Sequence, residues 1–272
     1  MSNFSSIGFA VHTEEEFREL VEFCFEKGQK IRSHGGTYFV YSDKSGAALY
    51  GQLNPQNEII GINPHFAGKS KRRVCLTATY ARPESELDGA FHCWADPEHE
   101  NDPDSGAYPF VFDAPDFNTI GEIRYPKDFS IQLAAFAREI ELYDDEPAFE
   151  EQQHGIGEGA SEVGFAAQSF IPTGLFSEEE NSTPEATGLF AGIIKEWELR
   201  SNEHTGATFY WLLVETLGCE VDVVFDPIFT DKEPRVGGVV QGTFWLSGKL
   251  IDPPFQGAIA ETKKSFWKKL FG

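Results

Sequence analysis

The sequence has few basic residues for its length. Lys and Arg together number 22, against 44 Asp and Glu, so the formal net charge is −22. A field of that sign repels a phosphate backbone. We therefore expect no nucleic-acid partner, and the acidity alone does not identify another one.

Long apolar runs are also missing. No run reaches the roughly 20 residues that a transmembrane helix needs. Residues 1–6 contain neither the basic segment nor the apolar segment of a signal peptide. With 40% hydrophobic residues, the chain belongs to the globular class. We expect a soluble cytoplasmic protein, and the lack of targeting signals suits a bacterium.

Cysteine is scarce and widely spaced. The chain has four cysteines and no C-x-x-C sequence, which disfavours a zinc or redox motif. Buried free thiols in a reducing compartment are the simpler interpretation. We therefore expect no metal and no disulfide at these four positions, which are Cys24, Cys75, Cys93 and Cys219.

Motifs of known catalytic chemistry are absent. The H-G-G sequence at 34–36 has the form of a hydrolase oxyanion element, but no G-x-S-x-G nucleophile elbow accompanies it. The glycines of 155–159 follow no strand-like run, and no Walker A sequence occurs. We expect no cofactor, and the catalytic residues are unknown. His65, His92 and Glu122 are only arbitrary first choices for an enzyme.

One acidic segment has part of a cation-binding pattern. Five carboxylates and one histidine lie between Asp96 and Gly106. A calcium loop would need a bidentate Glu six residues after the glycine, where this chain has Phe112. A solvated hairpin loop is favoured, and a weak Ca²⁺ site is the alternative.

Two helices are predicted. Thr13 and Glu16 have the spacing of a capping box, and the apolar residues that follow repeat with helical period up to a stop at Gly28. A strand over Ile7–Val11 precedes this helix. A second helix is predicted over Asp128–Tyr143 from an apolar stripe after Pro126.

Short strands separated by turn residues fill the rest of the first half. This order predicts an α+β fold with a mostly antiparallel sheet. Over about residues 4–66 the order of elements resembles the βαβββ unit of the vicinal-oxygen-chelate fold, without its metal ligands. The predicted strands are 37–42, 47–53, 58–63, 73–81, 90–95, 109–113 and 164–171.

Five strand-like runs follow an acidic, linker-like segment at 177–184. Their number, spacing and glycines resemble a small OB-fold barrel, with a small sandwich as the alternative. We expect a domain at 1–180, the OB-like barrel at 181–255 and a tail at 256–272. The five runs are 189–200, 208–216, 219–225, 236–241 and 243–250.

Aromatic residues of this barrel are candidate ligand contacts. OB-folds stack bases or sugars on such side chains. One face of each strand has to be core, so packing against the first half of the chain is the alternative interpretation. The candidate ligand-binding residues are Tyr210, Trp211 and Trp245.

The last ten residues combine four lysines with four large apolar side chains. As a helix they would have one apolar and one basic face. So short a helix is unstable alone, and it needs a partner protein, a membrane surface or the chain's own acidic body. The candidate partner-binding residues are Phe266, Trp267, Lys268, Lys269, Leu270 and Phe271.

Three functions follow from these observations. The first hypothesis is a non-catalytic cytoplasmic binding or adaptor protein that engages a partner through the tail or the barrel. The alternative is a small-molecule-binding protein or enzyme with a pocket in the N-terminal domain or at the domain interface. Single-stranded nucleic-acid binding by the barrel is disfavoured by charge.

Overall fold

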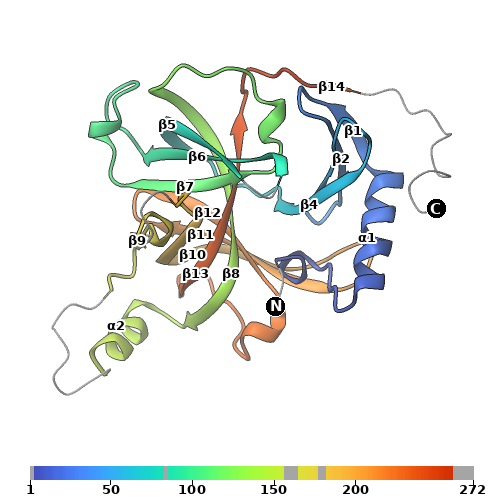
Figure 1. Cartoon of the computed structure of the whole chain (residues 1–272). Helices are drawn as coiled ribbons and strands as arrows, with labels where there is room; N and C mark the ends of the chain where they lie inside the picture. The colour runs from blue at the N-terminus through green and yellow to red at the C-terminus, as the bar shows by residue number, and fades with distance from the viewer. Residues whose placement is uncertain (1–2, 83–84, 156–164, 177–181, 260–272) are drawn as a thin grey trace.

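The computed structural model describes residues 3–82, 85–155, 165–176 and 182–259. The described chain is mostly β, with two sheets and two α-helices (Figure 1). No helix in these ranges is long and apolar enough to cross a membrane. Of the linker-like segment, residues 177–181 lie outside the described chain, as does the tail from 260 on.

Helix α1 (Glu14–Lys27) begins and ends where the sequence predicts. Thr13 accepts a hydrogen bond from the amide of Glu16, and the Glu16 carboxylate accepts one from the amide of Thr13, which completes the capping box. The amide of Gly28 closes the last turn on Cys24. This prediction is confirmed.

The predicted strand Ile7–Val11 is wrong. A 3₁₀ helix η1 (Ser5–Ile7) stands at its start, and the residues after it pair with no strand. Ile7 and Phe9 are fully buried in a core cluster. Their apolar spacing therefore reflects side-chain packing and not pairing in a sheet.

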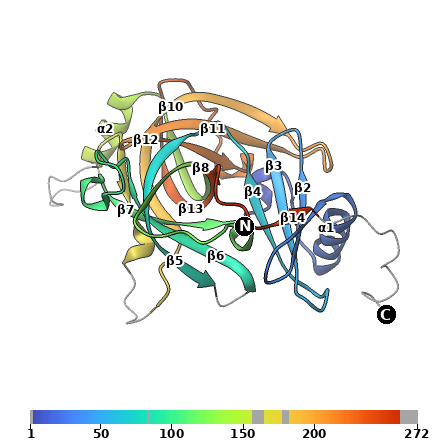
Figure 2. The same ribbon diagram turned by 90° about the horizontal axis from the view of Figure 1, so that it is seen from above.

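A five-stranded antiparallel sheet follows α1, in the order β14-β1-β2-β3-β4. Because no strand precedes the helix, the predicted βαβββ order does not form. Figure 2 shows this sheet beside the larger one, with α1 outermost. Its strands are β1 (Gln29–Arg32), β2 (Thr37–Ser42), β3 (Ala47–Leu53), β4 (Ile59–Phe66) and β14 (Ala258–Ile259).

The second sheet has nine strands drawn from both of the predicted segments 1–180 and 181–255, which we call the first and second half of the chain. The strands before residue 180 are β5 (Arg72–Arg82), β6 (Ser85–Ala95), β7 (Pro109–Ala114), β8 (Lys127–Tyr143) and β9 (Ser169–Ile171). Those after it are β10 (Thr187–Ser201), β11 (Thr208–Thr216), β12 (Cys219–Phe225) and β13 (Val239–Ile251). Helix α2 (Glu146–Gly155) follows β8.

The predicted helix Asp128–Tyr143 is wrong, because these residues form most of β8. Its backbone pairs with β5, β12 and β13. Consecutive residues from Leu133 to Ala137 are all buried, so both faces of the strand meet core. A segment that is apolar on both faces carries apolar residues at helical spacing as well as at strand spacing, and tertiary pairing decides between them.

The pairings close two rings of five strands that share β8 and β13. One ring is β8-β5-β6-β7-β13, and the other is β13-β10-β11-β12-β8. The strands β5, β6 and β7 of the first ring are antiparallel to their neighbours, and β7 closes the ring by pairing in parallel with β13. In the second ring β10, β11 and β12 are likewise antiparallel, and β12 pairs in parallel with β8. Asp113 of β7 pairs there with Ser247, and Asp222 of β12 pairs with Ala134. The two halves of the sheet thus repeat one topology.

The OB-like barrel predicted within 181–255 is not confirmed. The predicted runs 236–241 and 243–250 are one strand, β13. The fifth strand of the ring is β8, which lies before residue 180. The predicted segments 1–180 and 181–255 therefore contribute strands to a single sheet.

Core packing joins the two sheets. Leu20, Cys24 and Phe25 of α1 lie in one buried cluster with Phe209 and Trp211 of β11. Side chains from the ring interiors form the largest cluster. The outer face of one ring is consequently covered by the five-stranded sheet and α1.

Candidate functional site

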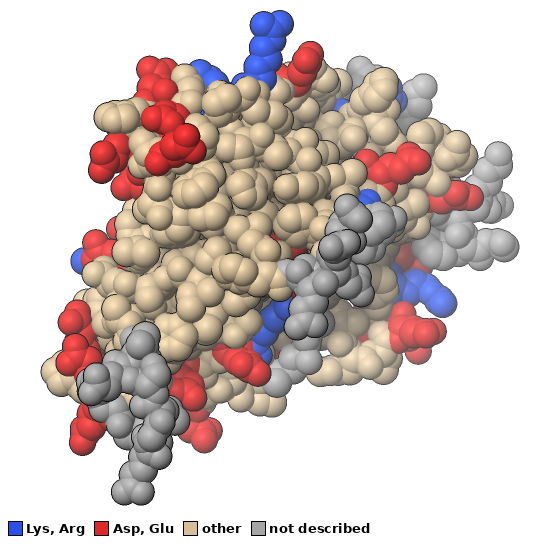
Figure 3. Space-filling view, turned by 60° about the vertical axis from the view of Figure 1, so that its left-hand side comes forward, with Lys and Arg blue, Asp and Glu red and all other residues tan. Residues whose placement is uncertain are grey.

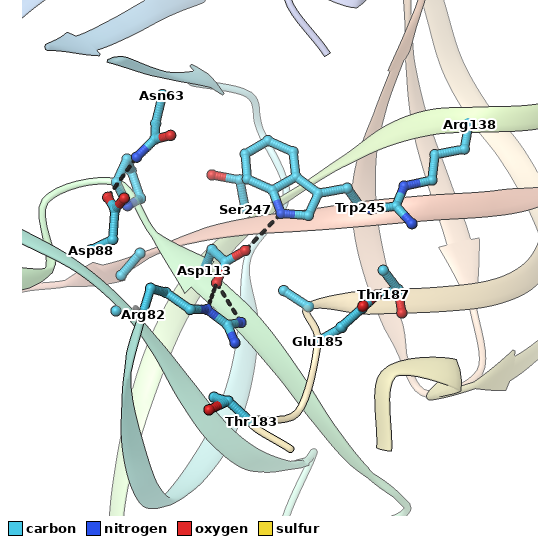
Figure 4. Close-up of a pocket in the computed structure, with 14 residues that line it drawn as sticks. Asn63, Arg82, Asp88, Asp113, Arg138, Thr183, Glu185, Thr187, Trp245 and Ser247 are labelled. Carbon is cyan, nitrogen blue, oxygen red and sulfur yellow. Dashed lines mark hydrogen bonds and ion pairs between the residues drawn. The ribbon is translucent and has the colours of Figure 1, made fainter. Parts of the chain in front are cut away.

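A cavity of about 550 Å³ lies where both sheets meet the segment that leads into β10 (Figure 4). Its wall comes from β4, β5, β6, β7, β8, β10 and β13, so residues distant in sequence converge there. The lining residues are Asn63, Arg82, Asp88, Gly89, Asp113, Ala114, Pro115, Arg138, Thr183, Glu185, Ala186, Thr187, Trp245 and Ser247.

The centre of the cavity wall is a hydrogen-bonded set of three side chains. The Arg82 guanidinium donates to one Asp113 oxygen, with Nε at 2.8 Å, and also to the carbonyl of Pro184 at 2.7 Å. The indole Nε1 of Trp245 donates to the other Asp113 oxygen at 2.7 Å. Side-chain exposures of 14% for Arg82 and 26% for Asp113 place this ion pair at a partly dehydrated surface. Both the carboxylate and the indole plane are thereby held in place.

A second carboxylate lies at the junction with the five-stranded sheet. Asp88 accepts hydrogen bonds from the side-chain amides of Gln52 and Asn63, the latter at 2.6 Å. Gln52 in turn accepts from the hydroxyl of Ser85 at 2.7 Å. Since each member has a partner, the carboxylate has a defined orientation toward the cavity.

A serine–histidine pair lies behind the same wall. The hydroxyl of Ser247 is 2.9 Å from Nδ1 of His65. Burial and, to a smaller extent, the positive charge of Lys249 together lower the pKa of His65 to about 3. Lys249 is itself held by Tyr50 and Asp116 at 2.9 and 2.8 Å. The imidazole is therefore neutral and a weak base at neutral pH.

The three predicted ligand-binding aromatics do not share a surface. Trp245 lines the cavity, as the figure of the site shows. Trp211 is only 2% exposed, and its indole donates to Asp222 at 2.8 Å. Tyr210 packs against the ring core and stacks on Phe225.

The predicted partner-binding residues 266–271 lie outside the described residues. Of the arbitrary enzyme choices, His65 is the buried partner of Ser247. His92 contacts Thr77 on β5, and burial lowers its pKa. Glu122 is exposed in the segment between η3 (Phe117–Thr119) and β8.

Five charged residues of the cavity were not predicted. They are Arg82, Asp88, Asp113, Arg138 and Glu185. The first four lie on four different strands and Glu185 lies just before β10, and no local motif distinguishes any of them. Trp245 was the one residue of this cavity that the sequence indicated, since an aromatic residue on a polar strand face suggests a contact surface.

Within the described ranges, no group of three or more His, Cys, Asp or Glu residues is placed to hold a metal ion. In the acidic segment 96–106, the Asp102 carboxylate accepts from the amide of Asp104 and begins the 3₁₀ helix η2 (Pro103–Ser105). Comparison with protein-family models, curated proteins and solved structures finds no match for this chain.

Proposed function

We propose that this chain is a small-molecule-binding protein and that its site is the cavity beside Trp245. The observation that supports this most is the set formed by Arg82, Asp113 and Trp245, which orients charged and aromatic groups toward a cavity of about 550 Å³. Ligand sites usually enclose about 300–1,000 Å³ and contain a few fixed polar groups.

The state of His65 supports binding over hydrolysis. A serine nucleophile needs a base that accepts its proton, and the optimal pKa of that base lies near the working pH. His65 contacts the hydroxyl of Ser247, but its pKa of about 3 is far below neutrality. The pair therefore fits a structural role in the cavity wall.

We further propose that each ring is an OB-like barrel in which one strand comes from the other half of the chain. The five-strand count and the parallel closing pair of each ring support this. A cytoplasmic location is supported by the four free cysteines, of which three are buried.

The test uses protein labelled with 5-fluorotryptophan, whose five indole positions give separate fluorine NMR signals. The Trp245→Phe variant assigns the cavity signal, and Trp197→Phe removes an indole outside the cavity as the matched control. A library of polar metabolites is then titrated. We expect at least one compound to shift the Trp245 signal. In calorimetric titrations, the same compound should bind Trp245→Phe more weakly and Trp197→Phe as tightly as the natural chain. Shifts confined to other indoles would contradict the proposal.

Partner binding through the tail is a second candidate, favoured by the alternation of lysines and large apolar residues from 263 to 272. The described chain ends as β14, which pairs with β1 at the edge of the five-stranded sheet. Pull-downs that compare the full chain with one ending at Ser265 test this candidate. A protein retained only by the full chain would support it, and identical empty pull-downs would contradict it.

A further inference from the structure

We infer that the ligand of the Trp245 cavity is a neutral polyhydroxylated molecule, a mono- or disaccharide. This inference rests on the proposed function of the same cavity and names its ligand class. It draws on the kinds of polar group in the wall, the way each is held, and the charge around them.

The wall offers hydrogen-bond donors and acceptors side by side. Asp88 and Asp113 supply carboxylate oxygens, while Arg138 supplies guanidinium N–H groups. A carboxylate or phosphate group of a ligand only accepts hydrogen bonds, and an ammonium group only donates them. A hydroxyl group donates one hydrogen bond and accepts others, so a set of hydroxyls is the complement of a mixed wall.

The polar groups are fixed before any ligand arrives. Asp88 is held by Gln52 and Asn63, and Asp113 is held by Arg82 and Trp245. A carboxylate has about four lone-pair positions, and both of these carboxylates line the cavity. Binding then costs little side-chain entropy, which matters for ligands that gain little from burial of apolar surface.

The indole of Trp245 is the flat apolar part of the wall. Its Nε1 hydrogen bond to Asp113 sets the plane of the ring, and Figure 4 shows Asp113 at the Nε1 edge of the indole and Arg138 on the neighbouring strand β8. The face of an aromatic ring is negative and attracts the weakly positive C–H groups of a sugar ring. The hydroxyls at the edge of such a sugar would then point toward the polar residues.

Charge disfavours anionic ligands. The wall has three carboxylates, from Asp88, Asp113 and Glu185, against the guanidinium groups of Arg82 and Arg138. Arg82 is already paired with Asp113. On the molecular face seen in Figure 3, acidic side chains outnumber basic ones. Sugar phosphates and nucleotides would therefore be repelled as they approach.

The ring that contains β12 has a similar pair of a carboxylate and an indole, but it is buried. Asp222 pairs with a shared strand in the same way as Asp113, and each carboxylate accepts an indole N–H. The amides of Lys69 and Ser70 close over Asp222, which is fully buried. Asp113 instead lines the cavity, with 26% of its side chain exposed.

The experiment titrates fluorotryptophan-labelled protein with glucose, galactose, mannose, N-acetylglucosamine, maltose and cellobiose at millimolar concentrations. Glucose 6-phosphate, glucuronate and glucosamine serve as charged analogues. We expect a neutral sugar to shift the Trp245 signal and to bind at least about tenfold more tightly than its charged analogue. Asp88→Asn and Arg138→Gln should each weaken binding about tenfold, the loss of one hydrogen bond to a charged group.

Lys44→Gln, which alters an exposed ion pair with Glu203, is the matched control and should not change affinity. Arg138 is exposed, so its variant tests the inference even if Asp88→Asn fails to fold. Charged compounds that shift Trp245 where neutral sugars do not would overturn this inference and leave the proposed function standing. If neither these sugars nor the metabolite library moves Trp245, both fail.

Discussion

Asp222 is a buried carboxylate whose four hydrogen-bond donors come from three separate segments of the sequence. It accepts hydrogen bonds from the amides of Lys69 and Ser70, the side-chain amide of Gln132 and the indole of Trp211, at 2.8–2.9 Å. Asp222→Ala leaves all four donors unpaired in the core. We expect a loss of about 3–5 kcal/mol in the free energy of unfolding, measured by urea titration.

Asp226→Ala is the matched control for that measurement. Asp226 directly follows β12, and its carboxylate only caps the 3₁₀ helix η5 (Pro227–Phe229) at the amide of Ile228. Loss of a helix cap costs about 1 kcal/mol. Equal losses in the two variants would show that the Asp222 cluster does not have the stabilising role assigned to it.

The imidazole of His65 provides a pH-dependent prediction. Its pKa in the folded chain is about 3, because burial and Lys249 disfavour the charged form. In the unfolded chain a histidine has a pKa of about 6.5. The unfolded state therefore binds a proton that the folded state lacks. This contribution to stability is complete above about pH 6.5 and falls by at most about 1.4 kcal/mol per pH unit toward pH 3.

NMR of the imidazole C–H groups checks this directly. The His65 signal should not titrate between about pH 5 and 8. In His65→Gln, which keeps a polar group near Ser247, the free energy of unfolding should depend less steeply on pH below about 6.5. A His65 titration midpoint near 6.5 would refute the buried, neutral state.

At the scale of single elements, the start of α1 is a local structure that can be tested alone. Thr13→Ala removes the hydroxyl that accepts from the amide of Glu16. We expect a loss of about 1 kcal/mol, measured as a lower urea midpoint. Thr13→Ser keeps the hydroxyl and should behave like the natural chain. A full-size loss in the serine variant would assign the effect to the methyl group.

Elements defined by neighbouring residues were predicted well. The observed bounds of β2, β3, β11 and β12 equal the predicted ones, and α1 has its predicted cap. In these segments the alternation or helical period and the flanking turn residues agree. The strand β8 was mistaken for a helix because Leu, Ala, Gln, Arg and Glu favour helices, and its pairing partners are far away in the sequence.

At the scale of the whole molecule, β8 and β13 complete both rings. Neither half of the chain contains all the strands of a ring. We therefore expect fragments 1–180 and 181–255, expressed separately, to give poorly dispersed NMR spectra. Mixing them should restore dispersion, since β8 would again pair with β12 and β13. A well-dispersed spectrum of fragment 181–255 alone would instead support the independent C-terminal domain that its sequence pattern predicts.

The candidate site also belongs to this scale. Trp245 was singled out from its strand, but Arg82, Asp88 and Arg138 join it only because four strands meet there. Ring closure brings β6, β7 and β13 together, and the five-stranded sheet adds Asn63. No spacing along the chain encodes that meeting, so single-sequence reasoning could reach one wall residue and not the cavity.

By itself, the sequence determined the net negative charge, the capped helix and the bounds of four strands, because these depend on residues that are neighbours in the chain. Only the tertiary structure decided that residues 127–143 are a strand, that two rings share β8 and β13, and that a cavity opens beside Trp245. The physical reason is that a strand's backbone hydrogen bonds are made with distant segments. Apolar spacing reports only that a segment is buried.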